Sequence, residues 1–238
     1  MIDQVLNCDK CLLTLIYKLR DKTMKKLFAI ISSLIFITTV TAKAEIGVGI
    51  TGAAHFMMAD GQEITRDSSE INEGSHDEAA IVPEIFIESI DDSGWTIGLS
   101  YIPTRDMGSK SRSDTASDGQ DTGTYTAKAE LDNVVQFYAD IPTGAIGSFP
   151  IHTKIGLQHV TLSTLETLNS GSSYPNKDLF GLTLGLGTKG DLPYGNNMYY
   201  KAEATYTDFE TYEQTSNGNV VKADLSDAAA KFSIGYKF

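Results

Sequence analysis

The sequence predicts an all-β fold, and three observations specify it as an eight-stranded antiparallel β-barrel. Apolar residues recur at every second position in eight separate segments, which is the period of a β-strand. The connections between these segments alternate between long and short, which is typical of a barrel with extended loops at one mouth and brief turns at the other. The chain offers no helices as a second layer, so the apolar faces must meet lipid or a second sheet. We therefore expect a transmembrane barrel.

The final segment, 228–238, shows this alternation most clearly. Its apolar or aromatic residues share one face: Ala228, Ala230, Phe232, Ile234, Tyr236 and Phe238. The intervening residues are small or cationic, as expected where one face of a strand meets lipid and the other does not.

The first three strands are expected upstream of it. The strand at 45–58 alternates apolar residues with mostly glycine, threonine and alanine. In the strand at 80–89, isoleucines alternate with glutamates, and Pro83 is expected at the start or at a bulge because it has no amide donor. A tight turn at 91–94 precedes the strand at 95–101.

The strand at 125–141 sets an apolar face against Lys128, Glu130 and Asp132, and these charges need either solvent or a paired interior. Three more strands are expected at 149–162, 180–187 and 198–206. The four long polar connections are predicted as external loops: 59–79, 103–123, 163–178 and 208–225. The sequence leaves open whether the barrel closes at eight strands or ten.

Charged residues fall on the inward faces of the predicted strands. They are Glu84, Glu88, Lys128, Glu130, Asp132, Lys154, Lys201, Glu203 and Lys231. An eight-stranded barrel is about wide enough for its side chains to fill it, which favours an interior charge network over a conducting path. A few residues depart from the pattern and indicate a bulge or a shifted register: Phe86, Ile102, Val134 and Val160 face inward, and His159 faces outward.

The region before the barrel has the parts of a secretory signal. Residues 24–44 begin with Lys25 and Lys26, continue with a short apolar run and end in Ala-Lys-Ala. The run is too short for a transmembrane helix, so we expect cleavage after Ala44 and a barrel domain at 45–238.

Residues 1–23 precede this signal and are expected to be a mis-assigned start or an extended n-region. They contain Cys8 and Cys11 in a C-x-x-C arrangement, which alone is half of a zinc site or a redox pair. Nothing later in the chain completes either, because these are the protein's two cysteines. The barrel domain is therefore expected to contain no disulfide.

Charge excludes one class of partner. Cleavage after Ala44 removes three of the 31 acidic and seven of the 19 basic residues, which leaves a formal charge of −16. Nucleic-acid binding needs a cationic surface that displaces counterions from phosphates, so no nucleic-acid partner is expected.

The signal, the eight alternating segments and the long-short order of connections resemble the small outer-membrane β-barrel superfamily. This group includes opacity proteins, porin-family surface antigens and the membrane domain of outer membrane protein A. The resemblance implies that Phe232, Ile234, Tyr236 and Phe238 form the C-terminal assembly signal. It also implies a location in the outer membrane of a Gram-negative bacterium, with membrane lipid and the barrel-assembly machinery as partners. Aromatic residues toward both ends of the apolar faces resemble interfacial girdles: Trp95, Phe137, Phe149 and Tyr236 near the short turns, and Phe56, Tyr101, Tyr125 and Tyr206 near the long loops.

The resemblance transfers a fold better than an activity. A structural and surface-interactive role is expected, with a narrow solute pore as the first alternative and a rim-sited lipid enzyme as the second. His159, near Thr161 and Ser163, is the most enzyme-like position, but no oriented base accompanies a nucleophile there. We expect no enzyme activity and no cofactor. The acidic stretch 59–79 lacks the spacing of a calcium loop, which favours a solvated loop over a metal site. The sequence names no loop ligand.

Overall fold

The computed structural model describes residues 44–238 except 65–70, 115–122, 168–173, 194–196 and 217–218. Residues 1–43 lie outside the described part of the chain. The secretory signal, its cleavage and the Cys8–Cys11 pair therefore remain predictions. None of the described residues belongs to a helix long and apolar enough to cross a membrane.

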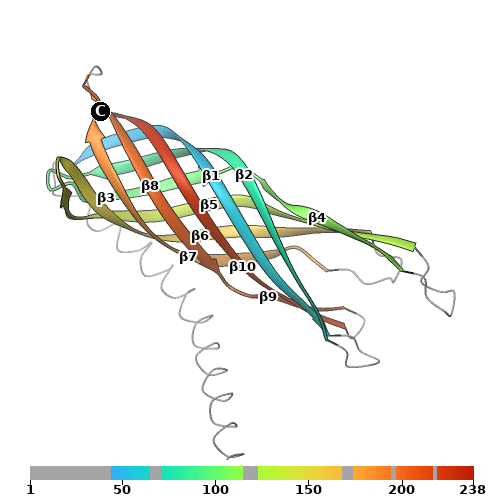
Figure 1. The fold of residues 1–238 in the computed structure, drawn as a ribbon. Helices are drawn as coiled ribbons and strands as arrows, with labels where there is room; N and C mark the ends of the chain where they lie inside the picture. Colours follow the sequence, from blue (N-terminus) through green and yellow to red (C-terminus); the bar gives the residue numbers. More distant parts are fainter. Residues whose placement is uncertain (1–43, 65–70, 115–122, 168–173, 194–196, 217–218) are drawn as a thin grey trace, which may run out of the picture. The chain divides into compact units, whose positions relative to one another are not determined.

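The described chain consists of antiparallel strands (Figure 1). They are β1 (Glu45–Ile64), β2 (Ile71–Ile90), β3 (Thr96–Ile102), β4 (Arg105–Asp114), β5 (Gly123–Ile146), β6 (Phe149–Thr167), β7 (Lys177–Asp191), β8 (Met198–Phe209), β9 (Tyr212–Ser216) and β10 (Asn219–Lys237).

Eight of these strands close into a barrel. The order is β1-β2-β3-β5-β6-β7-β8-β10, and β10 pairs again with β1 from Gly47↔Lys237 to Ile64↔Val220. The strands β4 and β9 do not widen the barrel. The strand β4 pairs with the part of β5 that lies beyond its pairing with β3, and β9 pairs with the part of β10 that lies beyond its pairing with β8. The structure thus confirms eight strands rather than ten.

The three short connections meet at one end of the barrel, as predicted. In the first, the Asp91 carboxylate accepts hydrogen bonds from the Ser93 hydroxyl (2.7 Å) and from the amides of Ser93 and Trp95 (both 2.9 Å). These bonds, the Ser93 hydroxyl first, hold the pKa of Asp91 below its ordinary value. Gly94 adopts a φ of +87°, which a glycine tolerates at no steric cost.

At the other end, the prediction of four long loops is wrong for most of their length. The strands continue into this region, so that β5 is 24 residues long and β1 and β2 are 20 each, and they form three paired hairpins, β1–β2, β4–β5 and β9–β10. A membrane crossing needs about 9–11 tilted residues, so each hairpin extends well past the crossing (Figure 1). The sequence pattern does not predict these extensions, because both faces of a solvated hairpin are polar and its residues do not alternate between apolar and polar.

The extensions divide into two groups, here called the two arms. One arm contains the outer halves of β1, β2 and β10 together with β9, and the other contains β4 with the outer parts of β5 and β6. The described part of β2 pairs with β3 from Ile85 onward and forms no ladder with β4. Pro83 lies just past the last pair, inside β2 rather than at its start, and this free edge tolerates its missing amide donor.

Apolar side chains of the barrel face outward, as the alternation predicts. Ile81 is 88% exposed, and Ile50, Leu184 and Phe232 are between 53% and 64% exposed. Exposed aromatic residues mark two levels, with Trp95 and Phe149 near the short turns and Phe56, Tyr101 and Tyr206 near the start of the arms. Two assignments to these girdles were wrong: Phe137 pairs with Leu99 between the two levels, and Tyr125 pairs with Arg112 far out in the arm.

Small residues on the inner face make room for larger ones opposite. A Cβ on Gly235 would overlap the ring of the buried Tyr199, whereas a Cβ on the outward-facing Gly52 would meet nothing within 4 Å. We expect Gly235→Ala to lower the free energy of unfolding by about 1–3 kcal/mol, the usual cost of overpacking. Urea unfolding of the detergent-folded protein measures this.

Gly52→Ala is the matched control for that experiment and should change stability by less than about 1 kcal/mol. Equal losses for the two variants would contradict the inward placement of Gly235.

Candidate functional site

The barrel interior is the candidate functional site, because it holds an unusual number of buried charged side chains. They form two ion networks, one nearer the short turns and one nearer the arms, here called the turn-side and arm-side networks. Inward-facing residues of many strands contribute because side chains along each strand alternate between lipid and lumen.

The turn-side network is built around Glu88 and Lys201. The Lys201 Nζ donates to Glu88 Oε2 at 2.7 Å, and the hydroxyls of Tyr138 and Tyr199 donate to the same carboxylate at 2.5 and 2.8 Å. The Lys201 Nζ also lies 3.6 Å from Asp140 Oδ2. Both Glu88 and Lys201 are 2% exposed, so the pair is removed from water and depends on these partners.

A second lysine completes this network. The Lys154 Nζ lies 3.0 Å from both Asp140 Oδ1 and Glu203 Oε1, and 3.5 Å from the centre of the Tyr138 ring. The His152 Nε2 lies 2.9 Å from Glu203 Oε1. Lys154 therefore bridges two carboxylates that would otherwise repel each other.

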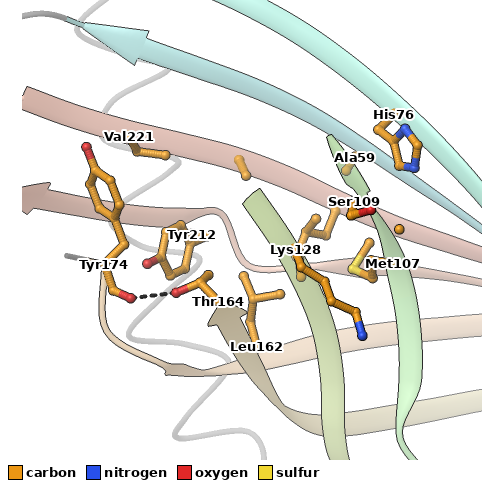
Figure 2. Close-up of a pocket in the computed structure, with 14 residues that line it drawn as sticks. Ala59, His76, Met107, Ser109, Lys128, Leu162, Thr164, Tyr174, Tyr212 and Val221 are labelled. Atoms are coloured by element: carbon orange, nitrogen blue, oxygen red, sulfur yellow. Dashed lines mark hydrogen bonds between the residues drawn. The ribbon is translucent and has the colours of Figure 1, made fainter. Parts of the chain in front are cut away.

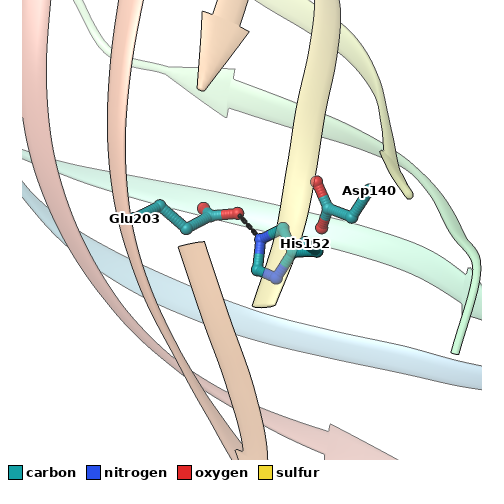
Figure 3. A group of neighbouring side chains, drawn as sticks. All are labelled: Asp140, His152 and Glu203. Carbon is teal, nitrogen blue, oxygen red and sulfur yellow. Dashed lines mark hydrogen bonds and ion pairs between the residues drawn. The ribbon is translucent and has the colours of Figure 1, made fainter. Parts of the chain in front are cut away.

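Asp140, His152 and Glu203 have the donor types of a metal site, and their ligand atoms lie within 4.8 Å of one another (Figure 3). Lys154, however, already supplies the cation that two of these three residues face. A divalent ion would add charge beside an ammonium group, and that repulsion disfavours binding. Among the described residues this is the one such cluster, and its geometry fits a lysine-centred ion network better than a metal.

The arm-side network is built around Asp227. The Arg105 Nη1 donates to Asp227 Oδ2 at 2.6 Å, and the His55 Nδ1 lies 2.8 Å from the same oxygen. The opposite ring nitrogen of His55 lies 3.2 Å from Glu84 Oε1, which also accepts from Lys231 Nζ at 2.8 Å. Two acidic and two basic residues thus balance around one histidine.

Neutral polar residues occupy another part of the lumen. Thr183 accepts a hydrogen bond from the Gln136 amide at 2.9 Å and lies 2.8 Å from the Thr207 hydroxyl, and the Gln158 amide donates to Thr207 at 3.2 Å. The hydroxyls of Thr51 and Ser233 lie 2.7 Å apart across the β1–β10 pair. These short side chains fill the space without adding charge.

Toward the arms the interior becomes apolar. Twelve buried residues form this layer: Met57, Val82, Ile102, Met107, Leu131, Val134, Val160, Leu162, Leu179, Phe209, Tyr212 and Leu225. Three of the four inward apolar departures noted in the sequence belong to it, and the fourth, Phe86, packs beside Tyr199. All four departures pack inside the lumen, and Val134 also lies in a β-bulge of β5, as predicted for such departures. His159 faces outward and packs edge-on against Phe180.

Six of the nine residues expected in the interior network lie in the two networks: Glu84, Glu88, Lys154, Lys201, Glu203 and Lys231. The other three, Lys128, Glu130 and Asp132, do not, and their placement is corrected here. A β-bulge between Asp132 and Val135, with Asn133 at a φ of +51°, reverses the alternation of β5.

Because of that bulge, Leu131 faces inward and its charged neighbours lie on the other face. The Lys128 Nζ there contacts Glu130 at 2.6 Å and Asp106 at 2.9 Å, at the partly exposed surface of its arm.

Several network residues were missed from the sequence. Arg105 lies in the predicted loop 103–123. Asp227 lies just before the predicted start of the last strand at Ala228, although it shares the inward parity of Lys231. Tyr138, Asp140 and His152 were on inward faces but were not singled out, since their importance comes from partners on other strands.

The remaining expected sites lie on the outer surface. Phe232, Ile234, Tyr236 and Phe238 all point outward, and the rings of the last two are in edge-on contact. Near His159, Thr161 donates to Asp178 at 2.8 Å, and the same carboxylate lies 3.9 Å from the His159 Nε2; Ser163 donates to Asp132 at 2.6 Å. Of the acidic stretch 59–79, residues 65–70 lie outside the described part of the chain.

The buried networks generate a stability prediction. Lys201→Met removes the ammonium group that lies 2.7 Å from the Glu88 carboxylate, while Lys154 remains beside Asp140 and Glu203. We expect a loss of about 3–5 kcal/mol in the free energy of unfolding, because breaking a buried pair strands an uncompensated charge. Adding Glu88→Gln should recover part of this loss. Denaturant unfolding in detergent measures both.

The control is Lys222→Met, which removes a partner of Glu213 (3.3 Å) at the surface and should cost at most about 1 kcal/mol. A comparable small cost for Lys201→Met would show that the turn-side network does not stabilise the barrel.

No protein-family model and no curated protein matches the chain. Solved structures with a related fold include the outer membrane protease OmpT from Escherichia coli, at 9% identity and a TM-score of 0.42, covering 84% of this chain and 99% of that one. Outer membrane protein AlkL is 9% identical with a TM-score of 0.44, and the match covers 84% of this chain and 93% of that one. Neisserial surface protein A is 12% identical with a TM-score of 0.32, and the match covers 79% of this chain and 97% of that one. These distant likenesses assign no activity; in fold, the chain is similar to small outer-membrane β-barrel proteins.

Proposed function

We propose that this protein is an integral outer-membrane barrel with a closed lumen, which stabilises the membrane and presents four long connections outside the cell. The observation that carries the proposal is the combination of an apolar outer surface with an interior in which the buried charges are paired. Closed barrels are one of two backbone forms that leave no unsatisfied polar edge in hydrocarbon.

The layered lumen supports this role over that of a narrow pore. A solute crossing the barrel would have to displace the turn-side network, then the threonine and glutamine side chains or the arm-side network, and finally the apolar layer. Breaking each buried ion pair costs several kcal/mol. An apolar layer adds a barrier to any hydrated ion, because ions lose solvation there.

Labelling on intact cells tests the topology. Ser111 lies exposed on β4 in an arm, and Asp92 lies exposed in a short turn. Because residues 45–238 contain no cysteine, Ser111→Cys and Asp92→Cys each add a single thiol to the barrel. A membrane-impermeant maleimide should label Ser111→Cys on intact cells and Asp92→Cys only after the outer membrane is permeabilised.

Recovery of the protein in the soluble periplasmic extract, or labelling of Asp92→Cys on intact cells, would overturn the proposed location or orientation. A gel of unheated and heated outer membranes gives an independent check, since a folded barrel should migrate differently until it is boiled.

Planar-bilayer recordings test the closed lumen. The purified protein should give no stable conductance steps, because no continuous hydrated path crosses the paired charges and the apolar layer. Reproducible, solute-permeable openings would instead favour the narrow pore. A large-pore porin inserted in the same bilayer serves as the positive control.

A further inference from the structure

The apolar layer continues outward into a pocket between the two arms (Figure 2). The pocket has a volume of about 210 Å³ and is lined by fourteen residues from β1, β2, β4, β5, β6, β9 and β10 and from the segment before β7. Its apolar lining includes Met107, Ala129, Leu162, Tyr212, Ala223 and Leu225. Four of these six belong to the buried apolar layer, which therefore forms part of the pocket wall.

We infer that this pocket binds a free, neutral, apolar small molecule about the size of one aromatic ring. The volume supports that size, because an apolar cavity of about 150 Å³ stays dry and binds benzene. An apolar pocket with few polar groups is also the usual form of a small-molecule site.

The polar residues around the pocket support a neutral ligand. The Lys128 ammonium is held by Glu130 and Asp106, so its charge is already balanced. Thr164 donates its hydroxyl proton to the carbonyl of Tyr174, and Tyr212 donates to the carbonyl of Pro175 at 3.1 Å. These three groups point to protein partners, and the His76 Nε2 lies 3.6 Å from the Glu78 carboxylate, so a charged ligand would lose hydration and gain little in return.

The position of the pocket distinguishes a free molecule from a membrane lipid chain. Its lining residues lie beyond the aromatic level marked by Phe56, Tyr101 and Tyr206, on the arm side of each strand. The buried lining residues, such as Leu162 and Leu225, also face the inside of the ring of strands. An acyl chain in the surrounding bilayer contacts the opposite face of the wall.

Methionine methyl NMR tests the inference on the protein purified in detergent micelles. Met107 lines the pocket, whereas Met198 lies on β8 near the short turns. With methyl-labelled methionine, titration with toluene should shift the Met107 signal saturably. The Met198 signal should change only in proportion to the toluene dissolved in the micelle. Sodium benzoate, of similar size but charged, should produce no saturable shift.

Two variants of β10 provide matched controls. Ala223→Phe fills the pocket and should abolish the saturable shift, while Ala230→Phe adds the same ring on the exposed outer face and should leave it unchanged. Both must keep the heat-modifiable mobility of a folded barrel. If Ala223→Phe does not fold, the smaller Ala129→Val replaces it and should weaken toluene binding several-fold.

Several results would overturn the inference. They are the absence of a saturable Met107 shift, equal shifts at Met107 and Met198, saturation by benzoate but not toluene, and an unchanged shift in Ala223→Phe. A saturable Met107 shift on adding detergent alone would mean that an acyl chain, rather than a free molecule, occupies the pocket.

Discussion

Closure of the sheet between β1 and β10 is the constraint on which the rest of the structure depends. The two strands pair over eighteen consecutive residue pairs, from Gly47↔Lys237 to Ile64↔Val220. Without this ladder, both strands would expose a row of amide and carbonyl groups, which cannot be satisfied in hydrocarbon. With it, the wall is continuous around the barrel, and apolar side chains can face outward along its whole circumference. The terminal aromatic residues Phe232 and Tyr236 lie on this closing strand.

Closure at eight strands then dictates the character of the lumen. A ring this small leaves space that side chains fill, so each inward residue must find a partner among its neighbours. Charged residues are tolerated because Glu88, Lys154 and Lys201 each contact at least two groups. Glycines such as Gly235 are required where the Tyr199 ring crosses to reach Glu88. The ion networks are therefore a consequence of a narrow barrel and not by themselves a sign of transport or catalysis.

Much of this architecture could be predicted from alternation alone, and the exceptions have physical causes. The alternation correctly predicts which side chains point outward and which point inward wherever one face of a strand meets lipid, as for the outward Ile85 and the inward Glu84. They were misread at Leu131, because one bulge at Asn133 reverses every residue on the far side of it and leaves no mark in composition. The arms were taken for loops, since solvated hairpins carry polar residues on both faces. The buried Arg105 lies in one of these predicted loops, and the buried Asp227 lies just before the predicted start of the last strand.

The place where the wall stops being continuous explains why polar and apolar interiors meet there. Below the arms, each strand is paired on both sides, and the lumen is sealed by side chains held on a rigid ring. Beyond Ile85, β2 loses its partner β3 and forms no ladder with the described β4, so the two arms are joined only through side chains on that side. An apolar layer at this level excludes water from the ion networks beneath it, which strengthens them because their attraction grows as the dielectric falls. Four residues of the same layer, Met107, Leu162, Tyr212 and Leu225, line the pocket between the arms. A pocket at that position follows from ending the ladder before the apolar packing ends.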